Sequence, residues 1–233
     1  MNDGLAGIAL LKARSDIDSK HIGVWGLSQG GWLGPLAASR SNDVAFVVAV
    51  SGPGVTPGEQ MIFFYANELR RKGFSAEEIE DASTVRGKVW NYLANGTGYE
   101  QAKSAIQSAQ AKRWYESLRD QRDHVIESFN RADVVRNDDW YTTEMNYDPV
   151  ATLRKLKVPA LFLFGDDDQL VPVPRSAKII QQTLTASGNR DFTIKIFPGA
   201  DHQLLLHTGP GAFQLAPGYQ ETMKQWLVKR AGL

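Results

Sequence analysis

The sequence predicts an α/β fold, with a mostly parallel sheet flanked by helices and interrupted by a helical insertion. Four short apolar runs lack the apolar–polar alternation of a one-sided sheet, which indicates strands buried on both faces. Helical patterns separate these runs, and this order is typical of parallel strands. From about residue 55 to residue 147 the strand-like runs stop and helical patterns take over.

The predicted strands share β-branched and aromatic residues and end close to glycine or proline. They are His21–Trp25, Val44–Val50, Ala160–Phe164 and Phe192–Phe197. Apolar residues at helical spacing predict the helices between and around them. These helices are about Leu5–Arg14, Gly31–Ala38, Ser176–Leu184 and Tyr219–Lys229.

The break in alternation divides the chain into a core, residues 1–54 and 148–233, and a helical insertion, residues 55–147. We expect helices over Glu59–Arg71, from Ser75 onward, and over about Gln101–Leu118. Ser75 and Glu78 form the S-x-x-E pattern of a capping box. Asp148-Pro149 predicts an N-cap and first helical residue where the chain returns to the core. An independent helical domain is the alternative, but no Pro/Gly/Ser-rich linker favours it.

Composition excludes several classes of function. Among 233 residues, 26 are Lys or Arg and 26 are Asp or Glu, so no basic excess predicts a nucleic-acid or anionic-membrane partner. The absence of cysteine excludes disulfides, thiolate metal sites and cysteine catalysis. No apolar segment is long enough to span a bilayer. The first residues lack a secretory signal, so a cytoplasmic location is expected if this start is the native one.

Ser28 is the candidate nucleophile. It lies in Gly26-Leu27-Ser28-Gln29-Gly30, between a predicted strand and a predicted helix. This G-x-S-x-G pattern is typical of a strained turn that exposes a serine hydroxyl, with the N–H of Gln29 beside it as an oxyanion donor. We expect the glycines two before and two after Ser28 to allow close approach of strand and helix. Alternatively, the serine only caps the helix.

A serine nucleophile needs a base, and four histidines are available: His21, His124, His202 and His207. His202 is preferred because it follows the fourth strand on a loop at the carboxyl edge of the sheet, where ligands bind in open α/β folds. His207 is the second choice, as a rim residue or a substrate contact. His21 lies at the opposite end of a strand, and His124 has the surroundings of a solvated helix face.

An acid must orient that histidine, and Asp166-Asp167-Asp168 follows the third strand directly. The alternatives for this acidic run are a turn with solvated charges and a site that binds a hard metal ion weakly. We predict no metal, because histidines at ligand spacing do not accompany it.

Three stretches together resemble the α/β-hydrolase superfamily, in particular dienelactone-hydrolase-like and serine-aminopeptidase-like esterases. One is the segment around Ser28. The second is Gly165-Asp166-Asp167-Asp168-Gln169-Leu170-Val171-Pro172, which resembles the acid loop G-x-x-D-x-x-V-P and selects Asp168. The third, Pro198-Gly199-Ala200-Asp201-His202, resembles the histidine loop P-G-x-x-H. The resemblance implies a Ser28–His202–Asp168 triad, a helical cap, and hydrolysis of small or medium acyl esters through an acyl-enzyme without a cofactor.

The chain departs from that family upstream of Ser28, where too few residues precede it for the family's first strands. The upstream loop that normally supplies a second oxyanion donor is also missing, which leaves Gln29 as the assigned donor. An impaired hydrolase acting as a binding or assembly module therefore remains an alternative. An amidase or peptidase with the same triad is another.

Two further expectations concern surfaces. The strand before Ser28, residues 22–26, has an unpaired edge, so we expect a homodimer formed through that edge. Aromatic residues of the insertion could line an acyl pocket, although a core of the insertion explains most of them better. They are Phe63, Phe64, Tyr65, Trp90, Tyr92, Trp114, Tyr115, Trp140 and Tyr141.

Overall fold

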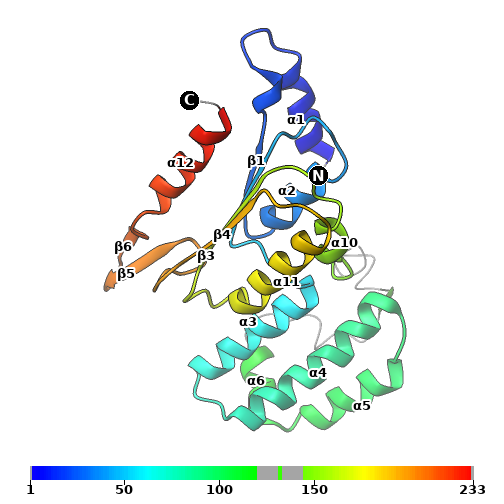
Figure 1. Ribbon diagram of the computed structural model, residues 1–233. Helices are drawn as coiled ribbons and strands as arrows, with labels where there is room; N and C mark the ends of the chain where they lie inside the picture. The colour runs from blue at the N-terminus through cyan, green and yellow to red at the C-terminus, as the bar shows by residue number, and fades with distance from the viewer. Residues whose placement is uncertain (1, 120–130, 133–143, 232–233) are drawn as a thin grey trace. The chain divides into compact units, whose positions relative to one another are not determined.

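A computed structural model describes residues 2–119, 131–132 and 144–231. The chain forms two compact units (Figure 1). One consists of Met1–Val55 with Asp148–Leu233, and the other of Thr56–Tyr147. Within the described residues, no helix has both the length and the hydrophobicity needed to cross a bilayer.

The first unit contains a four-stranded parallel sheet, as predicted. Its strands are β1 (Val24–Leu27), β2 (Val47–Val50), β3 (Ala160–Gly165) and β4 (Phe192–Phe197), in the spatial order β1-β2-β3-β4. Val47 pairs with both Val24 and Ala160, and Ala160 pairs with Phe192. Because all four strands are parallel, the loops that follow them all lie at the edge formed by the carboxyl ends of the strands.

Both faces of this sheet are buried, which explains the lack of polar alternation in its central strands. Val47, Ala49 and Phe162 pack on one face in a cluster that also holds residues of α11, whereas Val48, Leu161 and Leu163 pack on the other with α12. Every residue of β2 and β3 is buried. Figure 1 shows α12 on one side of the sheet, with α2, α10 and α11 on the other.

Helices complete this unit close to the predicted positions. They are α1 (Asn2–Lys12), α2 (Gly30–Ala38), α10 (Pro149–Leu153), α11 (Val173–Ala186) and α12 (Tyr219–Ala231). Asp148 caps α10 by accepting the N–H of Val150 at 2.8 Å, as expected. An antiparallel hairpin that the sequence did not predict, β5 (Leu205–Gly209) with β6 (Ala212–Leu215), precedes α12.

The first two strands start later than predicted. Residues 19–21 form a short 3-10 helix instead of the start of β1, because the Asp18 carboxylate accepts the N–H of Lys20 and contacts Nδ1 of His21 at 2.8 Å. Strand β1 therefore runs from Val24 to Leu27, directly into Ser28. Strand β2 begins at Val47, although Val44 is buried as expected.

The second unit is helical: α3 (Pro57–Arg71), α4 (Ala76–Asn95), α5 (Tyr99–Ala109) and α6 (Arg113–Arg119). Capping boxes start α3, at Thr56 and Glu59, and α4, at Ser75 and Glu78. The single helix predicted over Gln101–Leu118 is wrong, because the chain turns between α5 and α6, where the N–H of Lys112 bonds to the carbonyl of Ala109.

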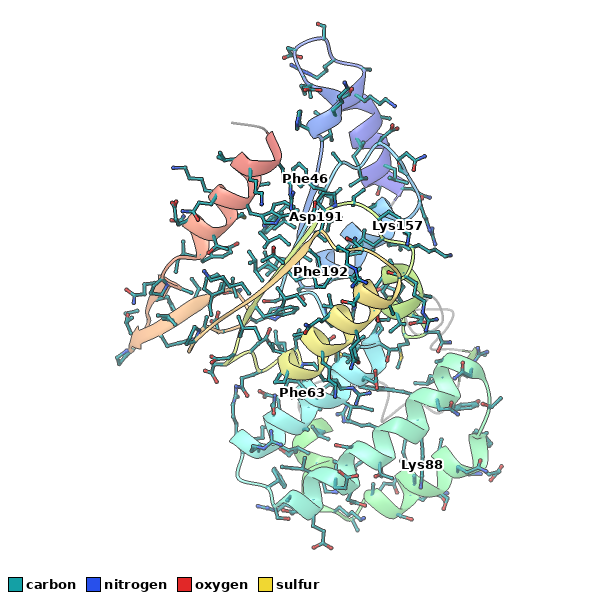
Figure 2. The ribbon with its side chains drawn as sticks, viewed as in Figure 1. Phe46, Phe63, Lys88, Lys157, Asp191 and Phe192 are labelled. Atoms are coloured by element: carbon teal, nitrogen blue, oxygen red, sulfur yellow. The ribbon has the colours of Figure 1, made fainter. Side chains whose placement is uncertain are left out.

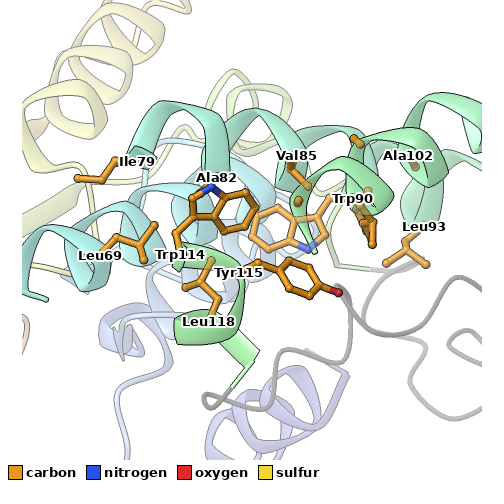
Figure 3. Packing of buried hydrophobic residues seen from close by; sticks show 14 of the residues in the cluster. Leu69, Ile79, Ala82, Val85, Trp90, Leu93, Ala102, Trp114, Tyr115 and Leu118 are labelled. Atoms are coloured by element: carbon orange, nitrogen blue, oxygen red, sulfur yellow. The ribbon is translucent and has the colours of Figure 1, made fainter. Parts of the chain in front are cut away.

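The aromatic residues of this unit belong mainly to its own core (Figure 3). Trp90, Trp114 and Tyr115 are buried among Leu69, Leu93 and other aliphatic residues, and Tyr65 and Tyr92 pack against that cluster. The core interpretation is therefore confirmed for these residues. Trp140, Tyr141 and His124 lie outside the described residues.

Candidate active site

Ser28 occupies the turn between β1 and α2 in a left-handed backbone conformation, with φ of 56°. Residues other than glycine rarely adopt this conformation, and it recurs at functional sites where the surroundings enforce it. Here the Ser28 N–H donates to the carbonyl of Val50 at 2.8 Å, and the Ser28 carbonyl accepts the N–H of Gly31 at 2.8 Å. The strained turn predicted for Ser28 is thus present.

Close backbone approach explains one glycine of the pattern but not the other. A Cβ on Gly26 would lie 2.4 Å from the carbonyl oxygen of Gly30, so residue 26 must lack a side chain. A Cβ on Gly30 would meet nothing within 4 Å, so the expected requirement there is wrong. Instead Gly31 is constrained, because its Cβ would lie 2.2 Å from the Cα of Gly52 in the segment that follows β2.

Gln29 follows Ser28 and is the N-cap residue of α2. Its φ and ψ of −53° and −34° are already helical, and its carbonyl accepts the N–H groups of Trp32 and Leu33. The Gln29 N–H therefore belongs to the first turn of a helix, where N–H groups and the helix dipole favour negative charge. This placement suits an oxyanion donor.

Asp168 and His202 form a direct pair. Nδ1 of His202 lies 2.8 Å from Oδ2 of Asp168, whose side chain is completely buried, while the His202 side chain is 14% exposed. Oδ1 of the same carboxylate accepts the N–H groups of Leu170 and Val171 at 2.8 and 2.9 Å. These bonds fix the carboxylate, so Nδ1 of His202 carries the proton and Nε2 is left as the basic nitrogen.

The two loops that carry this pair are joined along their backbones. The N–H of Asp166 donates to Phe197 and that of Asp167 to Ala200, at 3.2 and 3.0 Å. The Asp166 carboxylate in turn accepts the N–H of Gly199 at 2.5 Å. A Cβ on Gly165 would lie 2.1 Å from the carbonyl oxygen of Ala200, so a glycine at the end of β3 is required for this contact.

Asp201 shapes the turn that contains His202. Its Oδ1 accepts the N–H groups of Gln203 and Leu205 at 2.8 and 2.9 Å. Within the same turn Leu204 is buried and adopts a positive φ of 59°. The other carboxylate oxygen of Asp201 lies 3.1 Å from Nε2 of His207, the second-choice histidine, whose side chain is 59% exposed.

The predicted site residues thus lie at one edge of the sheet, but they are not all in contact. Ser28 follows β1, Asp168 follows β3 and His202 follows β4. The Asp168–His202 pair is formed, whereas the structure gives no hydrogen bond between the hydroxyl of Ser28 and His202. Of the other acidic residues, Asp166 and Asp167 are exposed. No cluster of three potential metal ligands occurs among the described residues.

Sequence comparison gives the family. The model of the family described as serine aminopeptidase, S33, matches residues 6–208, well over half of the chain and all three candidate residues. The chain belongs to this family. Membership of this family places the chain in the α/β-hydrolase superfamily. No curated protein sequence matches the chain.

Solved structures of other proteins are similar to this S33-family chain in fold. A puromycin-hydrolyzing peptidase from Mycobacterium tuberculosis has a TM-score of 0.51 at 13% identity, over 99% of this chain and 24% of that one. Dipeptidyl peptidase 4 from Porphyromonas gingivalis has a TM-score of 0.50 at 13% identity, over 98% and 22%. The chain thus spans about a quarter or less of the length of these peptidases. At these identities the likeness shows the fold alone: a partial α/β-hydrolase fold.

Proposed function

We propose that this chain is a serine hydrolase of the carboxylesterase type that cleaves esters of small or medium acyl groups. The observation that carries the proposal is the buried Asp168 carboxylate on Nδ1 of His202, at the sheet edge where Ser28 occupies its strained turn. In this proposal Ser28 attacks the ester carbonyl, and Nε2 of His202 accepts the hydroxyl proton. The proton then passes to the leaving alkoxide, and water releases the acyl group.

Asp168 holds the tautomer of His202 and stabilises the imidazolium that forms, while the Gln29 N–H donates to the developing oxyanion. Within the described residues Gln29 is the one donor that we assign, and loss of a donor typically costs ~10²–10³ in turnover. Esters have a better leaving group than amides, so their hydrolysis requires less stabilisation of the transition state by a site with one assigned oxyanion donor. The helical unit, residues 56–147, is proposed as the cap of this site.

A peptidase or amidase is the second candidate. The family is described as serine aminopeptidase, and the two solved structures described above are peptidases by title. The same triad serves both reactions, because the chemistry of acyl transfer is shared and the leaving group differs.

Turnover on matched substrates tests the proposal. Para-nitrophenyl esters and para-nitroanilides of the same two- to eight-carbon acids differ only in the leaving group, so their kcat/KM values compare the leaving groups directly. We expect ester hydrolysis that Ser28→Ala abolishes. Greater activity on the anilides would favour the peptidase, and no turnover by the folded protein would favour a non-catalytic binding or assembly module.

A further inference from the structure

Strand β4 leaves one edge of the sheet open. The carbonyls of Asp191 and Phe197 accept N–H groups of Ala160 and Asp166, so the odd-numbered residues of β4 face β3. Because bonding direction alternates along a strand, the backbone groups of Phe192, Ile194 and Ile196 point away from the sheet. No other described strand pairs with this edge.

A groove whose strand side is apolar runs beside the same edge, between β4 and α11. It has a volume of about 440 Å³, and the side chains of Phe192, Ile194 and Ile196 form its strand side. Figure 2 labels Phe192 at the start of β4. Ile196 is 41% exposed, which is high for an isoleucine in a strand. Pro174, Ala177, Lys178 and Gln181 line the groove from α11.

We propose that β4 pairs with β4 of a second copy of this chain, antiparallel and centred on Ile194, to form a homodimer with a continuous sheet. A two-fold axis perpendicular to the sheet places Ile194 opposite the partner's Ile194 and Phe192 opposite the partner's Ile196. All three outward-facing residues then pair, which gives about six inter-strand hydrogen bonds at two for each hydrogen-bonded pair. The two grooves then lie on the same face of the extended sheet.

The sequence of β4 selects this register. With Ile194 at the centre, Lys195 lies opposite the partner's Thr193, so no like charges face each other. A shift of two residues one way would set Lys195 against the partner's Lys195, and Phe192 against the partner's Pro198, which has no N–H to donate. A shift the other way would set the apolar Ile196 against the partner's Arg190. The strand is thus complementary to itself in one register.

Lysine on an edge strand often prevents such pairing, but Lys195 is engaged within its own chain. Its Nζ donates to the Thr222 hydroxyl at 2.8 Å and lies 5.2 Å from the ring centre of Phe197, on the face opposite the groove. The other free edge, β1, offers fewer outward-facing residues. The backbone N–H groups of Val24 and Ser28 donate to the segment of β2, at the carbonyls of Phe46 and Val50. The backbone groups of Trp25 and Leu27 therefore point away from β2. The dimer expected through β1 is therefore the competing arrangement.

The absence of cysteine makes single-cysteine crosslinking a direct test. In a hydrogen-bonded antiparallel pair the Cα atoms lie about 5.5 Å apart, within the range that a disulfide spans. Ile194→Cys is therefore expected to form a covalent dimer under mild oxidation. Thr193→Cys and Lys195→Cys are the matched controls, since each would lie diagonally from its own copy, at roughly 7–8 Å. Trp25→Cys probes the β1 edge.

We expect the wild-type chain to sediment as a dimer at about 10–100 μM and Ile194→Cys to crosslink far faster than the three other variants. A wild-type monomer in that range would overturn the proposal. So would crosslinking that is equal at all positions or that is fastest at Thr193, Lys195 or Trp25. Labelling of Ser28 by a fluorophosphonate in the same samples separates failure of this proposal from failure of the proposed function, because dimerisation does not involve the triad.

Discussion

Gly165 at the end of β3 lies so close to the carbonyl of Ala200 that a Cβ there would be 2.1 Å from that oxygen. This contact connects the sheet to the pair of loops that carry Asp168 and His202. The short separation of the two side chains therefore depends on a residue that takes no part in the chemistry. The position of the Asp168–His202 pair therefore depends on close packing of the backbone at Gly165 and Ala200 as well as on the two side chains.

Gly165→Ala is expected to destabilise the chain by about 3 kcal/mol, because the histidine loop must move to admit the methyl group. Urea unfolding measures this, and turnover measures the displacement of His202. Gly209→Ala is the control, since a Cβ there meets nothing within 4 Å. Equal stability of the two variants would contradict the close contact.

The two glycines that flank Ser28 are expected to respond differently. Gly26→Ala forces a Cβ against the backbone of Gly30 and should cost about 2–3 kcal/mol with loss of Ser28 reactivity. Gly30→Ala adds its methyl group to open space in a helix and should be neutral or stabilising by up to about 1 kcal/mol. Thermal unfolding of both variants checks this, and a Gly30→Ala variant as damaged as Gly26→Ala would refute it.

Asp168→Asn is expected to lower kcat by roughly 10³–10⁴, because an amide can stabilise the wrong tautomer of His202 and cannot stabilise the imidazolium. The matched control is Asp167→Asn, which changes an exposed neighbour that does not contact His202. Steady-state kinetics should show the loss in kcat with little change in KM. A similar loss in both variants would assign the effect to the loop instead of the pair.

The capping box of α4 makes stability depend on pH in acid. Glu78 accepts hydrogen bonds from Arg113 and from the N–H of Ser75, and these lower the pKa of its carboxyl from 4.5 to about 2. A lowered pKa in the folded state stabilises the fold above pH 4.5, and this contribution is lost as the pH falls from 4.5 towards 2.

Glu78→Gln should therefore be less stable than the wild type near pH 7, and the difference should shrink as the pH approaches 2. Thermal unfolding followed by circular dichroism between pH 2 and pH 7 measures it. Glu77→Gln is the control from the same helical turn, because Glu77 is exposed and does not belong to the capping box. A pH-independent difference for Glu78→Gln would exclude the ion pair as its cause.

The sequence predicted the sheet well where burial alone determines the pattern. Strand β3 matches within one residue because it is a buried, continuous apolar run that ends at glycine, and β4 matches because Pro198-Gly199 ends it. The start of β1 was wrong because Asp18 caps a 3-10 turn through His21, a local hydrogen bond that competes with strand pairing. The apolar pattern does not predict the β5–β6 hairpin because its residues are mostly exposed, and Pro210-Gly211 is the turn signal that marks it.

Within the site, Asp168 and His202 could be predicted because each follows a strand in a local pattern. The contributions of Gly165 and Gly52 could not be predicted. Gly165 and Gly52 matter through contacts with segments distant in sequence, and these depend on tertiary packing. Asp201 carries a local signal, since Asp side chains commonly bond to N–H groups two residues on, as Asp201 does to Gln203.

The proposed function requires Ser28 to be an activated nucleophile, and the intact mass of the protein after incubation with a fluorophosphonate shows whether it is. We expect one adduct on the wild-type chain, none on Ser28→Ala, and strongly slowed labelling of His202→Ala. Absence of an adduct on folded wild-type protein, or an adduct that persists in Ser28→Ala, would contradict it.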